Sequence, residues 1–174
     1  QAVDDFVTKA LATNPDQPVG VDEIVSFLTD QAKPALQADS LGLAAVFNPA
    51  ATYWLAAARL TDSKFVVIYT DSGNSGYGTA IVGQVSGTNI TWGNEYVFNP
   101  AGTFSEAVAA LSDSKFVVAY RDGGNSNYGT AIVGTVSDTS ISYSSEYVFN
   151  SALTDNVSVA ALTDSKFVVT YTDD

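Results

Sequence analysis

The sequence predicts a mainly β protein made of repeated antiparallel four-stranded units, preceded by a small helical N-terminal segment. Two sequence markers carry this prediction. One reads Leu-Thr-Asp-Ser-Lys-Phe-Val-Val and occurs, with one change in the middle copy, from Leu60, Leu111 and Leu162. The other reads Val-Phe-Asn and begins at Val46, Val97 and Val148. Both markers recur every 51 residues, so an internal repeat of that length organises most of the chain.

Residues 1–45 have helical rather than strand-like spacing. Apolar residues recur at intervals of three and four around Phe6 and again around Ile24, with acidic residues near the start of each stretch. Pro15 and Pro34 end these two stretches. Short amphipathic helices must bury their apolar faces, so we expect a small helical cap packed on the β region. A docking segment for a larger assembly is the alternative.

From residue 46 onward the apolar pattern alternates as in β-strands. In the second repeat we expect four strands, at 106–111, 115–120, 130–136 and 141–149. The second of these is apolar on both faces, with Phe116 and Val118 on one side and Val117 and Ala119 on the other. Such a strand fits a sheet that is covered on both sides. Four antiparallel strands in 51 residues have the size of a β-propeller blade, and a β-sandwich is the competing architecture.

The predicted domains are the helical segment 1–45 and a β-repeat domain at 46–174. The repeat domain contains two complete units, at about 54–98 and 105–149, and a half unit of two strands at 156–174. This is a partial propeller, because closed rings usually contain four to eight blades. The half unit leaves an unpaired strand edge, so we expect other protein subunits or self-association to cover it. Several chains completing one ring, a longer natural protein and an edge covered by a partner are all open explanations.

Composition limits the classes of function. The 174 residues are 46% hydrophobic, which is typical of a globular protein with its own core. The chain carries 19 acidic and 7 basic residues, and a net charge of -12 repels phosphate backbones, so we expect no nucleic acid partner. No apolar run approaches the length of a membrane span, so no transmembrane segment is expected.

Three residue types are missing from the sequence. The absence of Cys and His excludes disulfides, thiolate chemistry, a Ser-His-Asp triad and His-ligated metals. The chain also has no Met and begins with Gln1. Removal of a secretion or transit signal is the simplest explanation for such a start. We therefore expect the protein to work outside the cell or in an organelle lumen.

A loop rich in Gly, Asn and Ser joins the second and third strands of each complete unit. It reads Asp-Ser-Gly-Asn-Ser-Gly-Tyr-Gly from Asp71 and Asp-Gly-Gly-Asn-Ser-Asn-Tyr-Gly from Asp122. The loop resembles the Asp-box turn of sialidase-type propellers, with its aromatic residue one position late. Over residues 46–174 the repeats resemble the tandem propeller-type repeats of secreted and tail-fibre-like proteins. This resemblance implies a propeller fold and a structural turn, and it brings no catalytic motif.

The same loops supply the candidate ligand residues. Asp and Asn side chains often bond to nearby backbone N–H groups in turns, so a structural role is the first interpretation. Calcium held by the carboxylate and amide of each loop is the second, although strong calcium loops supply several carboxylates. A carbohydrate stacked on the loop tyrosines is the third. No other cofactor is expected. The candidate residues are Asp71, Asn74, Tyr77, Asp122, Asn125 and Tyr128.

Three residues depart from the repeat and are candidate interface positions. Trp54 stands where the other units have Ser105 and Asn156. Arg59 stands where the other units have alanine, and Arg121 stands where they have threonine. A residue specific to one unit serves something other than the repeat itself. We therefore expect these three residues at an interface or a binding surface.

The sequence favours a non-enzymatic structural or protein-interaction protein, acting as an extracellular or luminal subunit of a larger assembly. Repeated loops would also suit a multivalent carbohydrate-binding module, because repeats give multivalency. A glycosidase would have to use carboxylates such as Glu95 and Glu146. These two residues occupy the same position in successive repeats, which favours a structural role for both.

Overall fold

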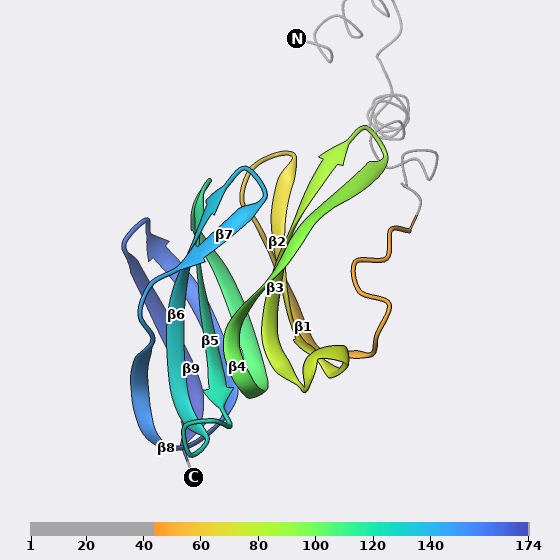
Figure 1. Cartoon of the computed structure of the whole chain (residues 1–174). Helices are drawn as coiled ribbons and strands as arrows, with labels where there is room; N and C mark the ends of the chain where they lie inside the picture. Colours follow the sequence, from red (N-terminus) through yellow and green to blue (C-terminus); the bar gives the residue numbers. More distant parts are fainter. Residues whose placement is uncertain (1–43, 174) are drawn as a thin grey trace, which may run out of the picture. The chain divides into compact units, whose positions relative to one another are not determined.

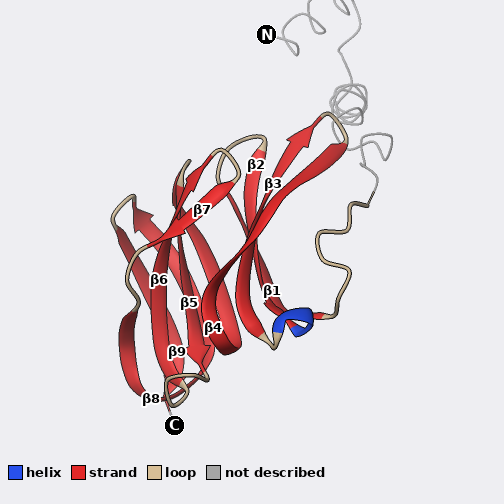
Figure 2. Cartoon of the chain, viewed as in Figure 1, coloured by secondary structure: helices blue, strands red, loops and turns tan. Residues whose placement is uncertain are grey.

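Antiparallel strands form one curled sheet, with the shape of a half-barrel, in the computed structural model of the chain (Figure 1). The structure describes residues 44–173, so the helical segment expected at 1–45 lies almost entirely outside the described residues. The mainly β fold class is confirmed. Within 44–173 the only helical element is the single turn η3 (Ser72–Asn74), drawn in blue in Figure 2. None of the described helices is long and apolar enough to cross a membrane.

Between residues 44 and 173, nine strands follow one another as a meander. Their order in space is β1-β2-β3-β4-β5-β6-β8-β9, and β7 pairs with β6 beside this path. Neighbours in sequence are therefore neighbours in space, so local hairpins build the sheet. The strands are β1 (Thr52–Arg59), β2 (Lys64–Asp71), β3 (Tyr77–Ser86), β4 (Asn89–Ser112), β5 (Lys115–Asp122), β6 (Tyr128–Ser137), β7 (Ser140–Tyr143), β8 (Tyr147–Thr163) and β9 (Lys166–Asp173).

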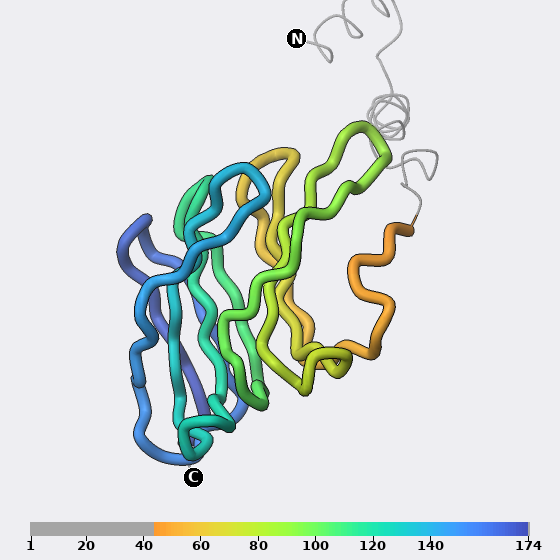
Figure 3. The backbone as a smooth tube through the Cα atoms, viewed as in Figure 1, coloured from red at the N-terminus to blue at the C-terminus, as the bar shows by residue number. Residues whose placement is uncertain are grey.

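The strands divide into three groups, because β4 and β8 each serve two groups. The first part of β4 pairs with β3 as far as Gly102, and its second part pairs with β5 from Thr103. In the same way, β8 pairs with β6 as far as Leu153 and with β9 from Thr154. The sequence pattern predicts separate strands on either side of these points. The chain instead turns from one group to the next within a single long strand (Figure 3).

Each group bends its first strand at the same place. The pairing of β1 with β2 shifts register between Tyr53 and Ala56, and β4 and β8 shift at the equivalent positions. The residues at these β-bulges have a positive φ, of 53° at Trp54, 49° at Ser105 and 52° at Asn156. A bulge bends a strand and increases its twist. The bend therefore recurs in every repeat. At Trp54 it places a bulky residue in a conformation that is strained for such a side chain.

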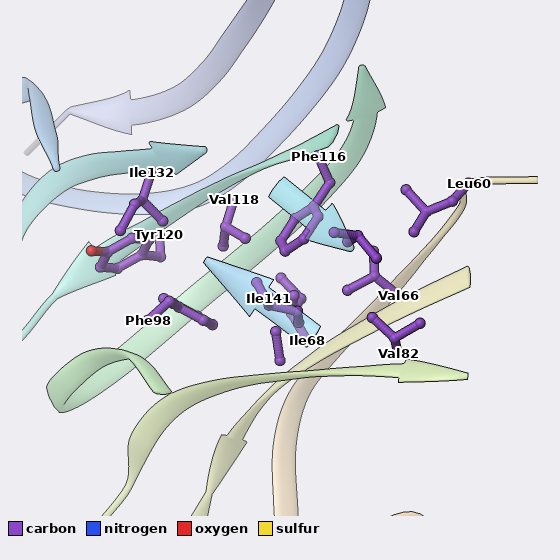
Figure 4. Close-up of a cluster of buried hydrophobic side chains, with 12 residues drawn as sticks. Leu60, Val66, Ile68, Val82, Phe98, Phe116, Val118, Tyr120, Ile132 and Ile141 are labelled. Atoms are coloured by element: carbon purple, nitrogen blue, oxygen red, sulfur yellow. The ribbon is translucent and has the colours of Figure 1, made fainter. Parts of the chain in front are cut away.

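The main core lies between the first and second groups of strands (Figure 4). Val66 and Ile68 of β2 share one buried cluster with Phe116, Val118 and Tyr120 of β5. The opposite face of β5, with Val117 and Ala119, is also fully buried. The two-sided apolar pattern of this strand therefore corresponds to a sheet that is covered on both faces. The remaining members of the cluster are Leu60, Ala80, Val82, Phe98, Ile132, Val136 and Ile141.

One aromatic contact repeats in all three groups. The ring centroids of Phe47 and Tyr69 lie 5.0 Å apart, those of Phe98 and Tyr120 5.2 Å, and those of Phe149 and Tyr171 5.1 Å. Each phenylalanine is the central residue of a Val-Phe-Asn marker, and each tyrosine lies in the second strand of the following group. Tilted and edge-to-face aromatic pairs at this distance add to the stability of a core. The marker phenylalanine thus packs the segment that precedes each group against the second strand of that group.

Candidate functional site

The loops after β2 and β5, which carry the predicted ligand residues, lie at the same end of the sheet (Figure 3). The Oδ1 atom of Asp71 accepts a hydrogen bond from the Gly73 N–H at 2.8 Å, and that of Asp122 accepts one from the Gly124 N–H at 2.9 Å. Both carboxylates are 5% exposed. Side-chain bonds of this kind close a turn on its own backbone. Each aspartate is therefore already engaged by its own loop.

Asp122 is tied to the preceding group as well. The Nδ2 atom of Asn99 donates to Asp122 Oδ1 at 2.9 Å and to Thr103 Oγ1 at 3.1 Å. The third group repeats the bond, since Asn150 Nδ2 donates to Asp173 Oδ1 at 2.8 Å. The asparagine of the Val-Phe-Asn marker thus holds the end of the strand that follows. Sequence reasoning missed this pair, although the constant spacing of the two residues was a visible signal.

The other loop residues are spread over the surface. Asn74 and Asn125 are exposed, while Tyr77 and Tyr128 are half-buried at the starts of β3 and β6. Within residues 44–173, no three carboxylate side chains lie close enough together to hold one metal ion. The loops therefore form well-defined turns, and the structure gathers no ligand set around Asp71 or Asp122.

Two buried tyrosines donate to the glutamates that sequence analysis considered for catalysis. The Tyr69 hydroxyl donates to Glu95 Oε1 at 2.6 Å, and the Tyr120 hydroxyl donates to Glu146 Oε1 at 2.9 Å. Burial, together with the neighbouring carboxylate, raises the pKa of both phenols above its usual range. The tyrosines therefore stay protonated and donate at every pH near neutrality. Glu95 and Glu146 accept equivalent bonds in successive groups.

Arg121, one of the three predicted interface residues, lies at the joint between the second and third groups. Its Nη1 atom lies 2.5 Å from Asp155 Oδ1, and its guanidinium is 4.7 Å from the ring centre of Phe104. Asp155 belongs to the part of β8 that pairs with β9. The ion pair therefore connects β5 with the C-terminal strands, within one chain.

The two other predicted interface residues lie at the first group. Arg59 pairs with Asp62 in the turn that follows β1, and the side chains of both residues are largely exposed. Trp54 is 51% exposed at the bulge of β1, next to Tyr53 and Leu55, which are exposed to a similar degree. The structure does not bring Arg59 or Trp54 together with Arg121 into one site.

Glu106 is a buried carboxylate that sequence reasoning missed. Its Oε1 atom accepts a hydrogen bond from Thr70 Oγ1 at 2.6 Å, and its Oε2 atom is buried without a partner. The residue is 9% exposed, and burial raises the pKa of its carboxyl to about 8. The equivalent residues are Leu55 and Val157, so a charged residue in place of two apolar ones was the available signal. Thr70 and Arg121 are equivalent positions, and both reach the first strand of the next group.

The strands β8 and β9 expose a surface that the other groups bury. We call it the C-terminal surface. It consists of Leu162 of β8 and of residues on both faces of β9, with Phe167 and Tyr171 on one face and Val168 on the other, and the four side chains are 66%, 36%, 40% and 44% exposed in that order. Among the described residues β9 is the last strand of the sheet and pairs with β8 alone. Its other edge therefore presents backbone N–H and C=O groups that no described strand uses.

Comparisons with protein-family models, with curated proteins and with solved structures gave no match.

Proposed function

We propose that this protein is a non-enzymatic structural and protein-interaction module, built from propeller-type repeats, that joins protein subunits through its open β edge. The C-terminal surface carries this proposal. Leu162 is 66% exposed, whereas Leu60, the first residue of an identical octapeptide, is 3% exposed. Apolar residues exposed beside a strand edge that no described strand uses are typical of a surface that another protein covers.

The packing of the groups supports the propeller-type interpretation over a β-sandwich. One face of β5 packs on the first group through Phe116, Val118 and Tyr120, and its other face is buried through Val117 and Ala119. In a two-sheet sandwich the outer face of each sheet is in contact with solvent. A central group covered on both faces is typical of blades stacked around an axis, where each blade packs on its two neighbours.

The alternatives draw less support from the side chains. A carbohydrate or calcium site in the loops would use Asp71 and Asp122, whose carboxylates are buried and bonded to backbone N–H groups. A glycosidase would use Glu95 and Glu146, each of which accepts a bond from a buried tyrosine in its own group. These contacts favour structural roles for all four residues.

Sedimentation of the full chain over a range of concentrations tests the proposal. We expect particles larger than one chain, because apolar surface that is open in the monomer is covered on association. A Val168→Lys variant should shift the particle towards single chains. Val85→Lys is the matched control, because Val85 has a similar exposure, 37% against 44%, but lies in β3, which has neighbours on both sides.

Two results together would contradict the proposal. One is a single-chain particle at every concentration. The other is amide hydrogens in β9 that exchange as slowly as those in β5, which would mean that the edge is not open.

A further inference from the structure

We propose that Asn89 is an attachment site for an N-linked glycan. The chain contains the acceptor pattern Asn-x-Ser/Thr twice, as Asn89-Ile90-Thr91 and as Asn156-Val157-Ser158. A pattern this short also arises by chance, so the structure around each asparagine has to distinguish the two copies. A glycan is bulky and hydrophilic, and it needs an asparagine on open surface. The two asparagines differ in this respect.

Asn89 lies at a tight turn between two strands. It is the first residue of β4 and pairs with Ser86, the last residue of β3, so Gly87 and Thr88 alone form the turn (Figure 1). Gly87 has a φ of 60°, and a Cβ atom added to it would meet no heavy atom within 4 Å outside the two neighbouring residues. The turn therefore has open space around it, and the side chain of Asn89 is exposed there.

The hydroxyl group that the pattern requires lies on the same side of the strand as the asparagine. Side chains two residues apart in a strand point to the same face of the sheet. Thr91 is exposed, as Asn89 is, and Ile90 between them is half-buried on the opposite face. The strand therefore presents the amide and the hydroxyl together and turns the apolar residue away from them.

The equivalent turn of the second group is exposed in the same way. Ser140 and Ser142, which occupy the positions of Asn89 and Thr91, are both exposed at the turn between β6 and β7. They remain exposed although the first group packs against the second. The exposure of this turn is therefore a property of the repeat, and it does not depend on whether another group lies in front of it.

Asn156 has different surroundings. It is the bulge residue of β8, with a φ of 52°, and its Nδ2 atom donates to Thr172 Oγ1 of β9 at 3.2 Å. Ser105, the equivalent residue of the second group, is 9% exposed, and its hydroxyl donates to Asp155 Oδ1 of the third group at 3.3 Å. The bulge position thus takes part in contacts between strands and between groups. A glycan at Asn156 would compete with these contacts, whereas one at Asn89 would extend into open space.

The second reactant is an oligosaccharide joined through a diphosphate to a lipid, which eukaryotic cells supply in the lumen of the secretory pathway. Asn89 Nδ2 forms a bond to the anomeric carbon of the first sugar and gives up one proton. The bond from that carbon to the diphosphate oxygen breaks, and the lipid diphosphate leaves with its electron pair. No residue of the chain is oxidised or reduced.

Secretion of the full chain from a eukaryotic cell line, followed by intact-mass measurement of the chain from cells and medium, tests the inference. We expect one glycan on each chain, removable by an N-glycosidase. Asn89→Gln should abolish the glycan. Thr91→Val should abolish it as well, because valine lacks the hydroxyl but keeps the branched side chain that suits a strand. Asn156→Gln is the matched control and should keep the glycan.

Urea denaturation shows whether the glycan is compatible with the fold. We expect the same midpoint before and after enzymatic removal of the glycan, because the turn at Asn89 is open. Absence of any glycan, or a glycan that persists in Asn89→Gln and is lost in Asn156→Gln, would overturn the inference. Equal modification of both asparagines would overturn it too, since the structure then would not distinguish the two sites. A glycan at Asn89 that lowers the urea midpoint would contradict the open turn on which the inference rests.

Discussion

The octapeptide Leu-Thr-Asp-Ser-Lys-Phe-Val-Val occurs at 60–67 and again at 162–169, and its two copies have similar local structure in different surroundings. Both copies pass through a turn at their Asp-Ser pair into a strand that pairs with a preceding Ala-containing strand, although the first two residues of the second copy still belong to β8. The aromatic pairs beside them have centroid distances of 5.0 and 5.1 Å. Yet Val66 is fully buried, and Val168 is 44% exposed. The difference lies in the next group of strands, which packs on β2, whereas within residues 44–173 no further group follows β9.

This comparison separates two contributions to the fold. The sequence of each unit is sufficient to specify the turn, the strand and the aromatic contact. Burial depends on a neighbouring group, and burial supplies most of the stability of a β-sheet face. The group that contains β5, with neighbours on both faces, should be the most stable part of the described residues, and β8–β9 the least stable.

Phenylalanines at equivalent positions should contribute unequally to the free energy of unfolding. Phe116 is fully buried, so Phe116→Ala should lower the free energy of unfolding by about 3–5 kcal/mol. Phe167 is 36% exposed, and Phe167→Ala should cost no more than about 1–2 kcal/mol. Urea denaturation of the two variants gives both values. Equal losses would mean that β9 is as well covered as β5.

Glu106 makes the joint between the first two groups sensitive to pH. Burial raises the pKa of its carboxyl in the folded protein to about 8, above the value of an unfolded chain. The protonated carboxyl therefore stabilises the fold at low pH, and this contribution is lost as pH rises towards and through 8. Glu106→Gln should remove the loss, with a gain on the order of 3 kcal/mol at pH 9 relative to the parent. The comparison of parent and variant from pH 4 to 9 isolates this group from the other carboxylates. A constant difference over that range would contradict a buried, proton-binding Glu106.

The Arg121–Asp155 pair should couple the second group to β8 and β9. Its atoms lie 2.5 Å apart, with side-chain exposures of 19% and 34%. A double-mutant cycle with Arg121→Thr, the residue of the other units, and Asp155→Asn should give a coupling of about 1–2 kcal/mol. The same cycle on Arg59 and Asp62, which are exposed, should give clearly less. Equal coupling energies would mean that solvent screens the Arg121–Asp155 pair as strongly as the exposed Arg59–Asp62 pair.

Exchanging the residues at two equivalent bulges should change the free energy of unfolding in opposite directions. Trp54 has φ 53°, a conformation that asparagine tolerates better than an aromatic residue. Trp54→Asn should therefore raise the free energy of unfolding by about 0.5–1 kcal/mol. Asn156→Trp should lower it by a similar or smaller amount, since this bulge lies in the less stable strands. A loss of stability in Trp54→Asn would show that the indole makes contacts that outweigh its backbone strain.

Much of the fold follows from the repeat. The 51-residue spacing, the alternation of apolar residues and the two-sided pattern around Phe116 predict the strands and the buried faces of the middle group. The turns can be predicted as well, because Asp71 and Asp122 lie two residues before glycines whose backbone N–H groups donate to these carboxylates. Local chemistry determines these features, so one sequence is enough to predict them.

Other features depend on contacts between units, which the repeat does not encode. The sequence marked Arg121 as unusual but could not identify Asp155, 34 residues further on, as its partner. Leu55 and Val157 at the equivalent positions mark Glu106 as unusual, but the sequence does not identify Thr70 of the neighbouring group as its partner. Identical residues at 60–67 and 162–169 cannot differ in any prediction made from local sequence. Their unequal burial is visible only once the groups are placed side by side.

The most direct test of this account is residue-resolved amide exchange by NMR in β5 and β9 of the full chain. We predict that central amides of β5 exchange only when the whole β-region unfolds. Those of β9 should exchange at least about a hundredfold faster, because one edge and part of one face are open. Equal exchange rates in β5 and β9 would contradict it, and would mean that β9 is covered as completely as the middle of the sheet.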